Sequence, residues 1–196
     1  MPIMPVGERV FCRTTAWGVF ARRAVPWALS RQALNGDVLE IGGGSGAMAV
    51  GMLTRFPSMR LVVVDLDPAM VAATTRRLGP FGARASVRIG DATALPFTDE
   101  SFDTVVSFLM LHHVGAWESA VAEVGRVLRP GGRFLGYDLP DSAISRTIHH
   151  ADGIHDMRSI TEPTFRAALA HAGVTDVRFN HGRLGLTLRW VATKTI

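Results

Sequence analysis

Cysteine and lysine are nearly absent from this sequence, because Cys12 is its only cysteine and Lys194 the only lysine among 21 basic residues. A single cysteine excludes a disulfide within the chain and a zinc site built from several cysteines. It suits a reducing compartment, so we expect a cytoplasmic protein. Long apolar runs are missing too: the longest uncharged stretches, Ile41–Thr54 and Thr104–Trp117, have 14 residues each. They are too short to cross a bilayer as a helix, so we expect no transmembrane segment.

Charged residues make up only 19% of the 196 residues, whereas 47% are hydrophobic. This balance can bury a sizeable core and predicts a single domain over residues 1–196. The net charge is +4, yet the arginines are scattered from Arg9 to Arg189. A nucleic-acid surface needs clustered basic residues, so the scatter makes nucleic acid an unlikely partner. Glu8 and Arg9 precede any apolar run long enough for a signal peptide.

From Asp37 onward, short β-branched runs alternate with helix-length segments, which is typical of βαβ units in a parallel sheet. The predicted strands are Val38–Ile41, Leu61–Val64, Ala85–Ile89, Thr104–Phe108 and Arg133–Tyr137. The predicted helices are Gly46–Arg55, Pro68–Leu78 and Trp117–Leu128. Asp67 is the expected N-cap of the second helix, with Pro68 in its first turn. Gly131-Gly132 is expected to close the third helix and to turn the chain into the next strand.

The alternation stops beyond Tyr137, because residues 138–161 are polar and weakly patterned. We predict that they form a substrate-side loop or lid. The last predicted elements are a helix at Glu162–Ala172 and strands at Val174–Phe179 and Leu184–Ala192. The turn between the two strands is short, so they must be antiparallel. Residues 1–35 are expected to form one or two helices that cover the sheet, broken near Pro26.

A glycine-rich turn follows the first predicted strand, where Val38–Gly46 reads Val-Leu-Glu-Ile-Gly-Gly-Gly-Ser-Gly. Glycine lets the backbone lie against a ligand, and the helix that follows offers free N–H groups. Gly42, Gly44 and Ala47 also fit the dinucleotide pattern, and Asp65 has about the spacing of its ribose-binding acid. This turn alone does not distinguish S-adenosylmethionine (SAM) from NAD.

Later motifs separate the two cofactors. They are Gly90-Asp91-Ala92-Thr93-Ala94-Leu95-Pro96-Phe97, Ser101-Phe102-Asp103-Thr104-Val105-Val106-Ser107 and Leu128-Arg129-Pro130-Gly131-Gly132-Arg133. Together with the glycine-rich turn, this ordered set resembles the class I SAM-dependent methyltransferases over about residues 35–140. The resemblance is to the small-molecule group that includes the ubiquinone/menaquinone C-methyltransferases.

The resemblance implies a doubly wound, Rossmann-like α/β fold with a seven-stranded sheet of order 3-2-1-4-5-7-6, the last strand antiparallel. Glu40 and the glycines of the turn would face the methionine part of SAM, Asp65 its ribose hydroxyls, and Asp91 and Ala92 its adenine edge. Leu66 and Met70 would pack near the adenine, and Ser107 would present its backbone carbonyl to the methionine ammonium. The implied cofactor-binding set is Glu40, Gly42, Gly43, Gly44, Gly46, Asp65, Leu66, Met70, Asp91, Ala92 and Ser107.

The implied activity is methyl transfer to a small organic acceptor, with release of S-adenosylhomocysteine. SAM is already activated, so much of the rate can come from holding the acceptor in line, and a base is needed only if the acceptor loses a proton. Candidate catalytic residues after strands four and five are His112, His113, Tyr137 and Asp138. Asp138 is the foremost candidate for an acceptor contact, whereas the histidines could instead pack or start a helix.

Substrate class is narrowed by Ser107-Phe108-Leu109-Met110, which stands where relatives that methylate nucleic-acid bases or glutamine carry Asn/Asp-Pro-Pro-Tyr/Phe. This departure argues against such substrates. An NAD-dependent oxidoreductase and a non-catalytic SAM-binding protein remain as alternatives.

Two further groups of residues each have two interpretations. Trp17, Phe20 and Trp27 are either lid residues over the acceptor or core packing. The polar segment 149–156 contains His149, His150, Asp152, His155 and Asp156. Several of these would share a face if the segment were helical, but nothing in its pattern indicates a helix, so we expect a loop and no metal site.

Overall fold

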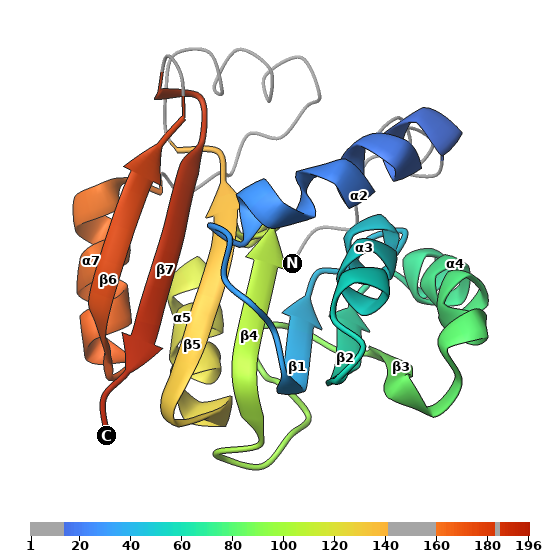
Figure 1. The fold of residues 1–196 in the computed structure, drawn as a ribbon. Helices are drawn as coiled ribbons and strands as arrows, with labels where there is room; N and C mark the ends of the chain where they lie inside the picture. The colour runs from blue at the N-terminus through green and yellow to red at the C-terminus, as the bar shows by residue number, and fades with distance from the viewer. Residues whose placement is uncertain (1–13, 141–159, 183–184) are drawn as a thin grey trace.

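The computed structural model describes residues 14–140, 160–182 and 185–196. Seven strands form one sheet of order β3-β2-β1-β4-β5-β7-β6 (Figure 1). They are β1 (Gly36–Ile41), β2 (Met59–Asp65), β3 (Ala85–Ile89), β4 (Phe102–Phe108), β5 (Leu128–Asp138), β6 (Val174–His181) and β7 (Leu188–Lys194). Strands β1 to β5 pair in parallel, and β7 runs antiparallel to both β5 and β6. The predicted fold and strand order are confirmed.

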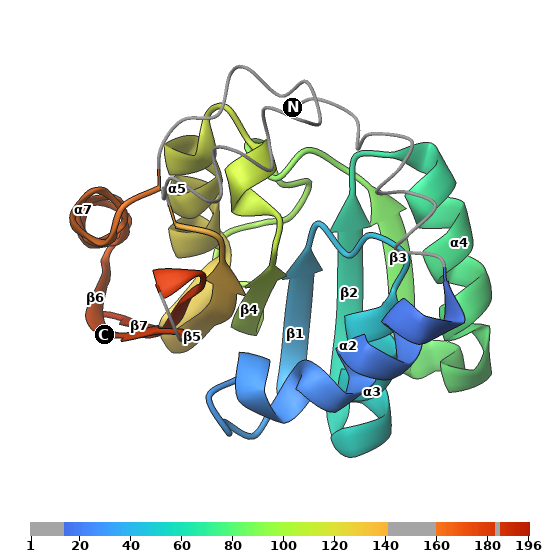
Figure 2. The ribbon, with the colours of Figure 1, turned by 90° about the horizontal axis from the view of Figure 1, so that it is seen from above.

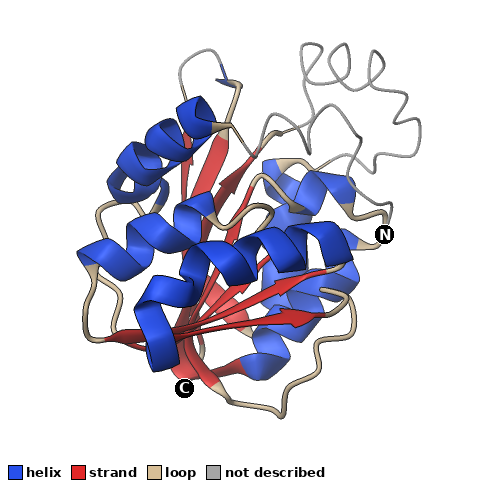
Figure 3. Cartoon of the chain, turned by 90° about the vertical axis from the view of Figure 1, so that its right-hand side faces the viewer, coloured by secondary structure: helices blue, strands red, loops and turns tan. Residues whose placement is uncertain are grey.

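Helices cover both faces of this sheet (Figures 2 and 3). They are α2 (Thr15–Ala28), α3 (Ala47–Arg55), α4 (Pro68–Leu78), α5 (Trp117–Val127) and α7 (Glu162–His171), with 3₁₀ turns η1 (Gly79–Arg84) and η2 (Leu111–His113). One apolar core lies under α5 and α7, and the other lies under α2, α3 and the end of α4. Neighbouring residues of β4, Val105 and Val106, belong to different cores, which explains why the central strands are apolar throughout.

Local sequence accounts for the helix that follows β2. Asp67 accepts a 2.8 Å hydrogen bond from the backbone N–H of Ala69, and Pro68 occupies the first helical position, where no N–H is required. Helix α4 therefore has its predicted bounds. Among the residues that the structure describes, no helix is long and apolar enough to cross a membrane.

Three of the predicted closures, breaks and turns were wrong, and several strands extend beyond their predicted bounds. Helix α5 ends at Val127, and the Gly131-Gly132 pair lies inside β5 instead of closing the helix. A bulge opposite Phe102–Thr104 absorbs these residues within the β4–β5 ladder.

Pro26 does not break α2, because it falls near the helix end, where Leu29 still donates to the Val25 carbonyl. Strand β7 begins at Leu188, later than predicted. The backbone N–H of Gly182 donates to the Thr187 carbonyl, so the turn between the last two strands extends to Thr187.

Candidate functional site

The glycine-rich turn after β1 takes backbone conformations that few side chains allow. Gly42 has a φ of 68° and donates from its N–H to the Val64 carbonyl at 2.8 Å. A Cβ added to Gly42 would lie 2.0 Å from Cγ of Met110, which fills the space beneath the turn. Gly46 has a φ of 77° and is the N-cap of α3. Steric packing and backbone torsion therefore both require glycine here.

Asp65 at the end of β2 joins the glycine turn to the start of α4. Its Oδ2 accepts a 2.8 Å hydrogen bond from the backbone N–H of Gly44, and its Oδ1 accepts a 2.9 Å bond from that of Asp67. Burial raises the pKa of Asp65 above its ordinary value, although these backbone hydrogen bonds oppose the rise. A carboxylate has about four acceptor positions. The acceptor positions that the backbone bonds leave open fit the predicted ribose hydroxyls.

Glu40 on β1 is a buried carboxyl group that is only partly satisfied. Its side chain is 2% exposed, and within the described ranges its Oε2 atom has no hydrogen-bond partner. Burial, with the charge of Asp65 added, raises the pKa of Glu40 to about 8. A buried carboxylate of this kind is costly unless a donor or a cation reaches it. The site thus fits a ligand that carries positive charge, such as SAM.

The turn is also held from the side of α4 by residues that the sequence did not reveal. Thr74 donates from its hydroxyl to the Gly44 carbonyl at 2.7 Å, and Arg77 donates to the Ser45 hydroxyl at 3.0 Å. About 30 residues separate the partners along the chain, and neither α4 residue belongs to a motif. Only the packing of α4 against the turn could identify them.

The predicted adenine-binding residues follow β2 and β3. Asp91 Oδ1 accepts from both the backbone N–H and the hydroxyl of Thr93, each at 2.8 Å, which forms a tight turn. Ala92 and Met70 are buried, whereas Leu66 is partly exposed.

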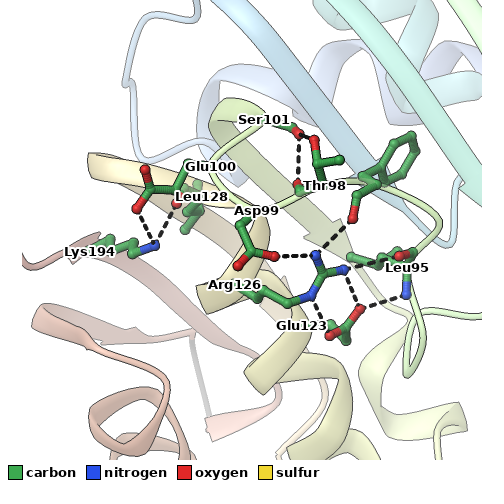
Figure 4. Close-up of polar contacts among 10 residues, drawn as sticks. Leu95, Thr98, Asp99, Glu100, Ser101, Glu123, Arg126, Leu128 and Lys194 are labelled. Carbon is green, nitrogen blue, oxygen red and sulfur yellow. Dashed lines mark hydrogen bonds and ion pairs between the residues drawn. The ribbon is translucent and has the colours of Figure 1, made fainter.

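Arg126 on α5 fixes the loop that continues from Asp91 (Figure 4). It donates to the carbonyls of Phe97 at 2.7 Å and Leu95 at 3.0 Å, and it binds the carboxylates of Glu123 and Asp99. The hydrogen bond from Arg126 holds the pKa of Glu123 below its ordinary value. This network fixes the loop that follows the predicted adenine-binding residues Asp91 and Ala92.

Ser107 lies at the centre of the sheet, paired with Ile41 on one side and Gly136 on the other. A Cβ added to Gly136 would lie 2.1 Å from the Ser107 carbonyl oxygen. The Ser107 hydroxyl is buried and has no hydrogen-bond partner among the residues described. The predicted carbonyl contact with the methionine ammonium stays a prediction.

Asp138 at the end of β5 binds the 3₁₀ turn η2. Its carboxylate accepts from the backbone N–H groups of Leu111 at 2.8 Å and Leu139 at 2.7 Å, and it pairs with Nδ1 of His112. Burial alone would raise the pKa of Asp138, but the charge and hydrogen bond of His112 hold it below its ordinary value. Both side chains are almost fully buried. The ring of His113 packs on that of His112, with centroids 3.9 Å apart.

Tyr137 connects the end of β5 to α2. Its ring packs edge-on against Trp27 at 4.9 Å and lies 5.8 Å from Phe108. Trp27 is 43% exposed and Phe20 is 59% exposed, so part of the aromatic face of α2 is not used in the core. This arrangement is compatible with both predicted roles of the α2 aromatic residues.

Most of the predicted lid lies outside the described residues, as does the whole of the segment 149–156. Within the part of the chain that is described, no group of three or more His, Cys, Asp or Glu residues could hold a metal ion. The prediction that 149–156 binds no metal therefore stays a prediction.

The remaining predicted site residues gather at the carboxyl ends of the strands. Glu40 and Asp65 lie next to the glycine turn, at the ends of β1 and β2. Tyr137 and Asp138 lie at the end of β5, beside the turn η2, which contains His112 and His113. This edge is where ligands bind in doubly wound sheets.

Comparison with known proteins agrees with this geometry. Residues 39–136 match the methyltransferase domain family, and the chain belongs to that family. The ubiquinone/menaquinone biosynthesis C-methyltransferase of Dinoroseobacter shibae is 40% identical over 100 residues, which cover 50% of this chain and 40% of that protein. The demethylmenaquinone methyltransferase of Thermus thermophilus is 34% identical over 119 residues, which cover 61% of this chain and 53% of that protein.

The match to these relatives spans about half of their length or less. Among solved structures, a chain of the Haloferax volcanii complex of the Trm112 methyltransferase activator superposes with a TM-score of 0.81. The match covers 100% of both chains at 19% sequence identity. At that identity the likeness concerns the fold alone.

Proposed function

We propose that the chain binds SAM at the carboxyl ends of β1, β2 and β3 and transfers its methyl group to a small organic acceptor. The observation that carries this proposal is the unsatisfied buried carboxyl of Glu40 beside the glycine turn. SAM is a cation at its sulfonium and at its ammonium, whereas NAD would place its anionic pyrophosphate against the glycine turn, beside this carboxylate. Membership in the methyltransferase domain family supports the same cofactor.

Each part of the cofactor has a matching group in the chain. Glu40 binds the positive charge of the methionine part, and the backbone of the glycine turn lies against it. Asp65 accepts from the ribose hydroxyls while it keeps its bonds to Gly44 and Asp67. Asp91 accepts from the adenine amine, and Leu66 lines the adenine pocket. SAM, when bound, supplies a methyl group on a leaving sulfonium, so these residues need only bind and orient it.

The acceptor lies above β4 and β5, beside η2. Asp138 acts as a positioning residue, because its carboxylate already accepts from Leu111, Leu139 and His112. A proton on Nδ1 of His112, directed to Asp138, makes Nε2 the basic nitrogen of the ring. His112 is therefore our candidate to take a proton from an acceptor that must lose one.

Aromatic side chains favour an apolar or aromatic acceptor. The ring of Tyr137 contacts those of Trp27 and Phe108 at the end of β5, and Trp17 and Phe20 form a second aromatic pair on α2. The quinone methyltransferases named above act on acceptors of this character, which supports the assignment.

Incubation with SAM labelled on its methyl group tests the proposal. The acceptor panel should include hydroquinones, phenols, amines and carboxylic acids. We expect label on at least one class, with an equal amount of S-adenosylhomocysteine, and loss of transfer in Glu40→Gln. Tight SAM binding without transfer to any class would indicate a non-catalytic SAM-binding protein instead.

A further inference from the structure

A second site lies in a groove of about 390 Å³ between α2, α3 and α4. Arg22 of α2 and Arg77 of α4 line it, with Val50 of α3 and Pro80 and Phe81 of η1. Among the described residues no strand contributes to this lining, but Ala47 directly follows the glycine turn and Arg77 binds Ser45 of that turn, so the groove borders the turn from the side of the helices. We propose that this groove binds a phosphate-bearing small molecule through Arg22 and Arg77.

The groove carries two positive charges, those of Arg22 and Arg77, with no carboxylate among the described lining residues to balance them. Partial burial, with the like charge of Arg22 added, lowers the pKa of Arg77. Across the described ranges, neither arginine forms an ion pair, whereas Arg126 and Arg129 both bind carboxylates. An anion between the two guanidinium groups would remove their mutual repulsion and restore the balance.

The geometry of arginine favours phosphate over other anions. Arg77 is held in place by its 3.0 Å hydrogen bond to the Ser45 hydroxyl, which uses one of the five N–H donors of its guanidinium. Guanidinium groups present paired donors that match two phosphate oxygens. Two such groups on separate helices can hold one phosphate from two sides.

The remaining lining is mostly apolar, with Thr14 as its one polar residue among those described, and it indicates that the ligand carries an organic part. Phe81 presents a ring that Arg84 approaches to 5.6 Å from its centroid, and Val50 and Pro80 complete the wall. The groove is larger than a single phosphate requires. We therefore expect an organic phosphate to bind more tightly than inorganic phosphate, because its apolar part is removed from water.

Calorimetric titration with inorganic phosphate and with phenyl phosphate tests this site. Arg22→Gln and Arg77→Gln each remove one lining cation. Arg23→Gln and Arg76→Gln are matched controls, because each removes an exposed neighbour on the same helix that does not line the groove. Melting temperatures of all variants establish that they fold. Arg22 makes no side-chain hydrogen bond within the described ranges, so Arg22→Gln provides the test if Arg77→Gln is unstable.

We expect saturable binding, tighter for phenyl phosphate, which weakens by about tenfold (1.4 kcal/mol) or more in each groove variant and by no more than about twofold in the controls. Equal weakening in the controls would indicate a diffuse positive field and overturn the proposal. Displacement of phenyl phosphate by SAM would show that phenyl phosphate binds in the strand-end crevice, which would also overturn the proposal. Co-sedimentation with phosphatidylglycerol vesicles, without binding of phenyl phosphate, would overturn the small-molecule proposal and indicate that the groove binds a lipid headgroup. None of these readouts depends on the proposed methyl transfer.

Discussion

Asp65 accepts a 2.8 Å hydrogen bond from the backbone N–H of Gly44, so a carboxylate at the end of β2 fixes the turn that follows β1. The same carboxylate accepts from Asp67 at the start of α4. Its charge also contributes to the raised pKa of Glu40. One side chain thus sets the shape of the cofactor turn and the protonation of its neighbour.

Asp65→Ala should therefore affect both folding and cofactor binding. Two backbone donors lose their partner, so the free energy of unfolding should fall by about 1–3 kcal/mol, and SAM binding should weaken by about 1.5–3 kcal/mol. Urea unfolding and calorimetry measure the two effects. Asp67→Asn is the control, because asparagine caps a helix as well as aspartate and leaves the bond from Gly44 in place. Unchanged SAM affinity in Asp65→Ala would remove Asp65 from the site.

Glu40→Gln should stabilise the ligand-free protein and weaken SAM binding. The folded-state pKa of Glu40, about 8, lies above the ordinary value of 4.5. The contribution of this group to stability is therefore complete below pH 4.5 and is lost as the pH rises through 8. The variant should exceed the native chain in stability by an amount that grows across this window. Urea unfolding at several pH values measures it, and a constant difference would contradict the assigned pKa.

Binding of SAM should release a proton near neutral pH. Glu40 is largely protonated there in the ligand-free protein, because its pKa is about 8. A cation in contact with the carboxyl favours the ionised form and lowers that pKa. Calorimetry in two buffers of different ionisation enthalpy should show proton release in the native chain and none in Glu40→Gln. A binding enthalpy independent of buffer in the native chain would show that no cation reaches Glu40.

Asp138→Ala should destabilise the fold by about 3–5 kcal/mol, since it leaves His112 without its buried partner. The pKa of Asp138 is lowered from 3.8, so its contribution is present above pH 3.8 and is lost as the pH falls through the lower folded-state value. Unfolding experiments should show the loss at neutral pH and its decline in acid. His113→Asn is the control, because His113 packs beside the pair without forming it. An equal loss in both variants would assign the effect to ring packing.

Local signals explain which elements the sequence predicted well. Asp67 and Pro68 define the start of α4. The apolar runs predicted where the strands lie, and the family resemblance implied their order in the sheet. The end of α5 was predicted wrongly because Gly131-Gly132 has the composition of a turn, yet its backbone lies within a bulged ladder. The pairing of β5 with β4 determines the conformation of Gly131-Gly132, and this pairing cannot be read from the local sequence.

The site residues also divide into those that local sequence motifs reveal and those that depend on contacts between distant segments. The glycine turn, Glu40 and Asp65 belong to contiguous motifs at strand ends and could be named from the sequence. Thr74, Met110 and the pairing of His112 with Asp138 depend on contacts between segments distant along the chain. Such contacts arise only when α4 packs on the turn and β5 lies beside β4.

Calorimetric titration of the full chain with SAM, S-adenosylhomocysteine and NAD tests the central claim most directly. We expect SAM and S-adenosylhomocysteine to bind one molecule per chain, with SAM binding weakened by at least about tenfold in Glu40→Gln. A parallel melting experiment should show stabilisation by about 2.7 kcal/mol when SAM is present at about 100 times its dissociation constant. NAD should produce neither effect. Binding of NAD in the absence of any SAM binding would contradict the account and assign the glycine turn to a dinucleotide.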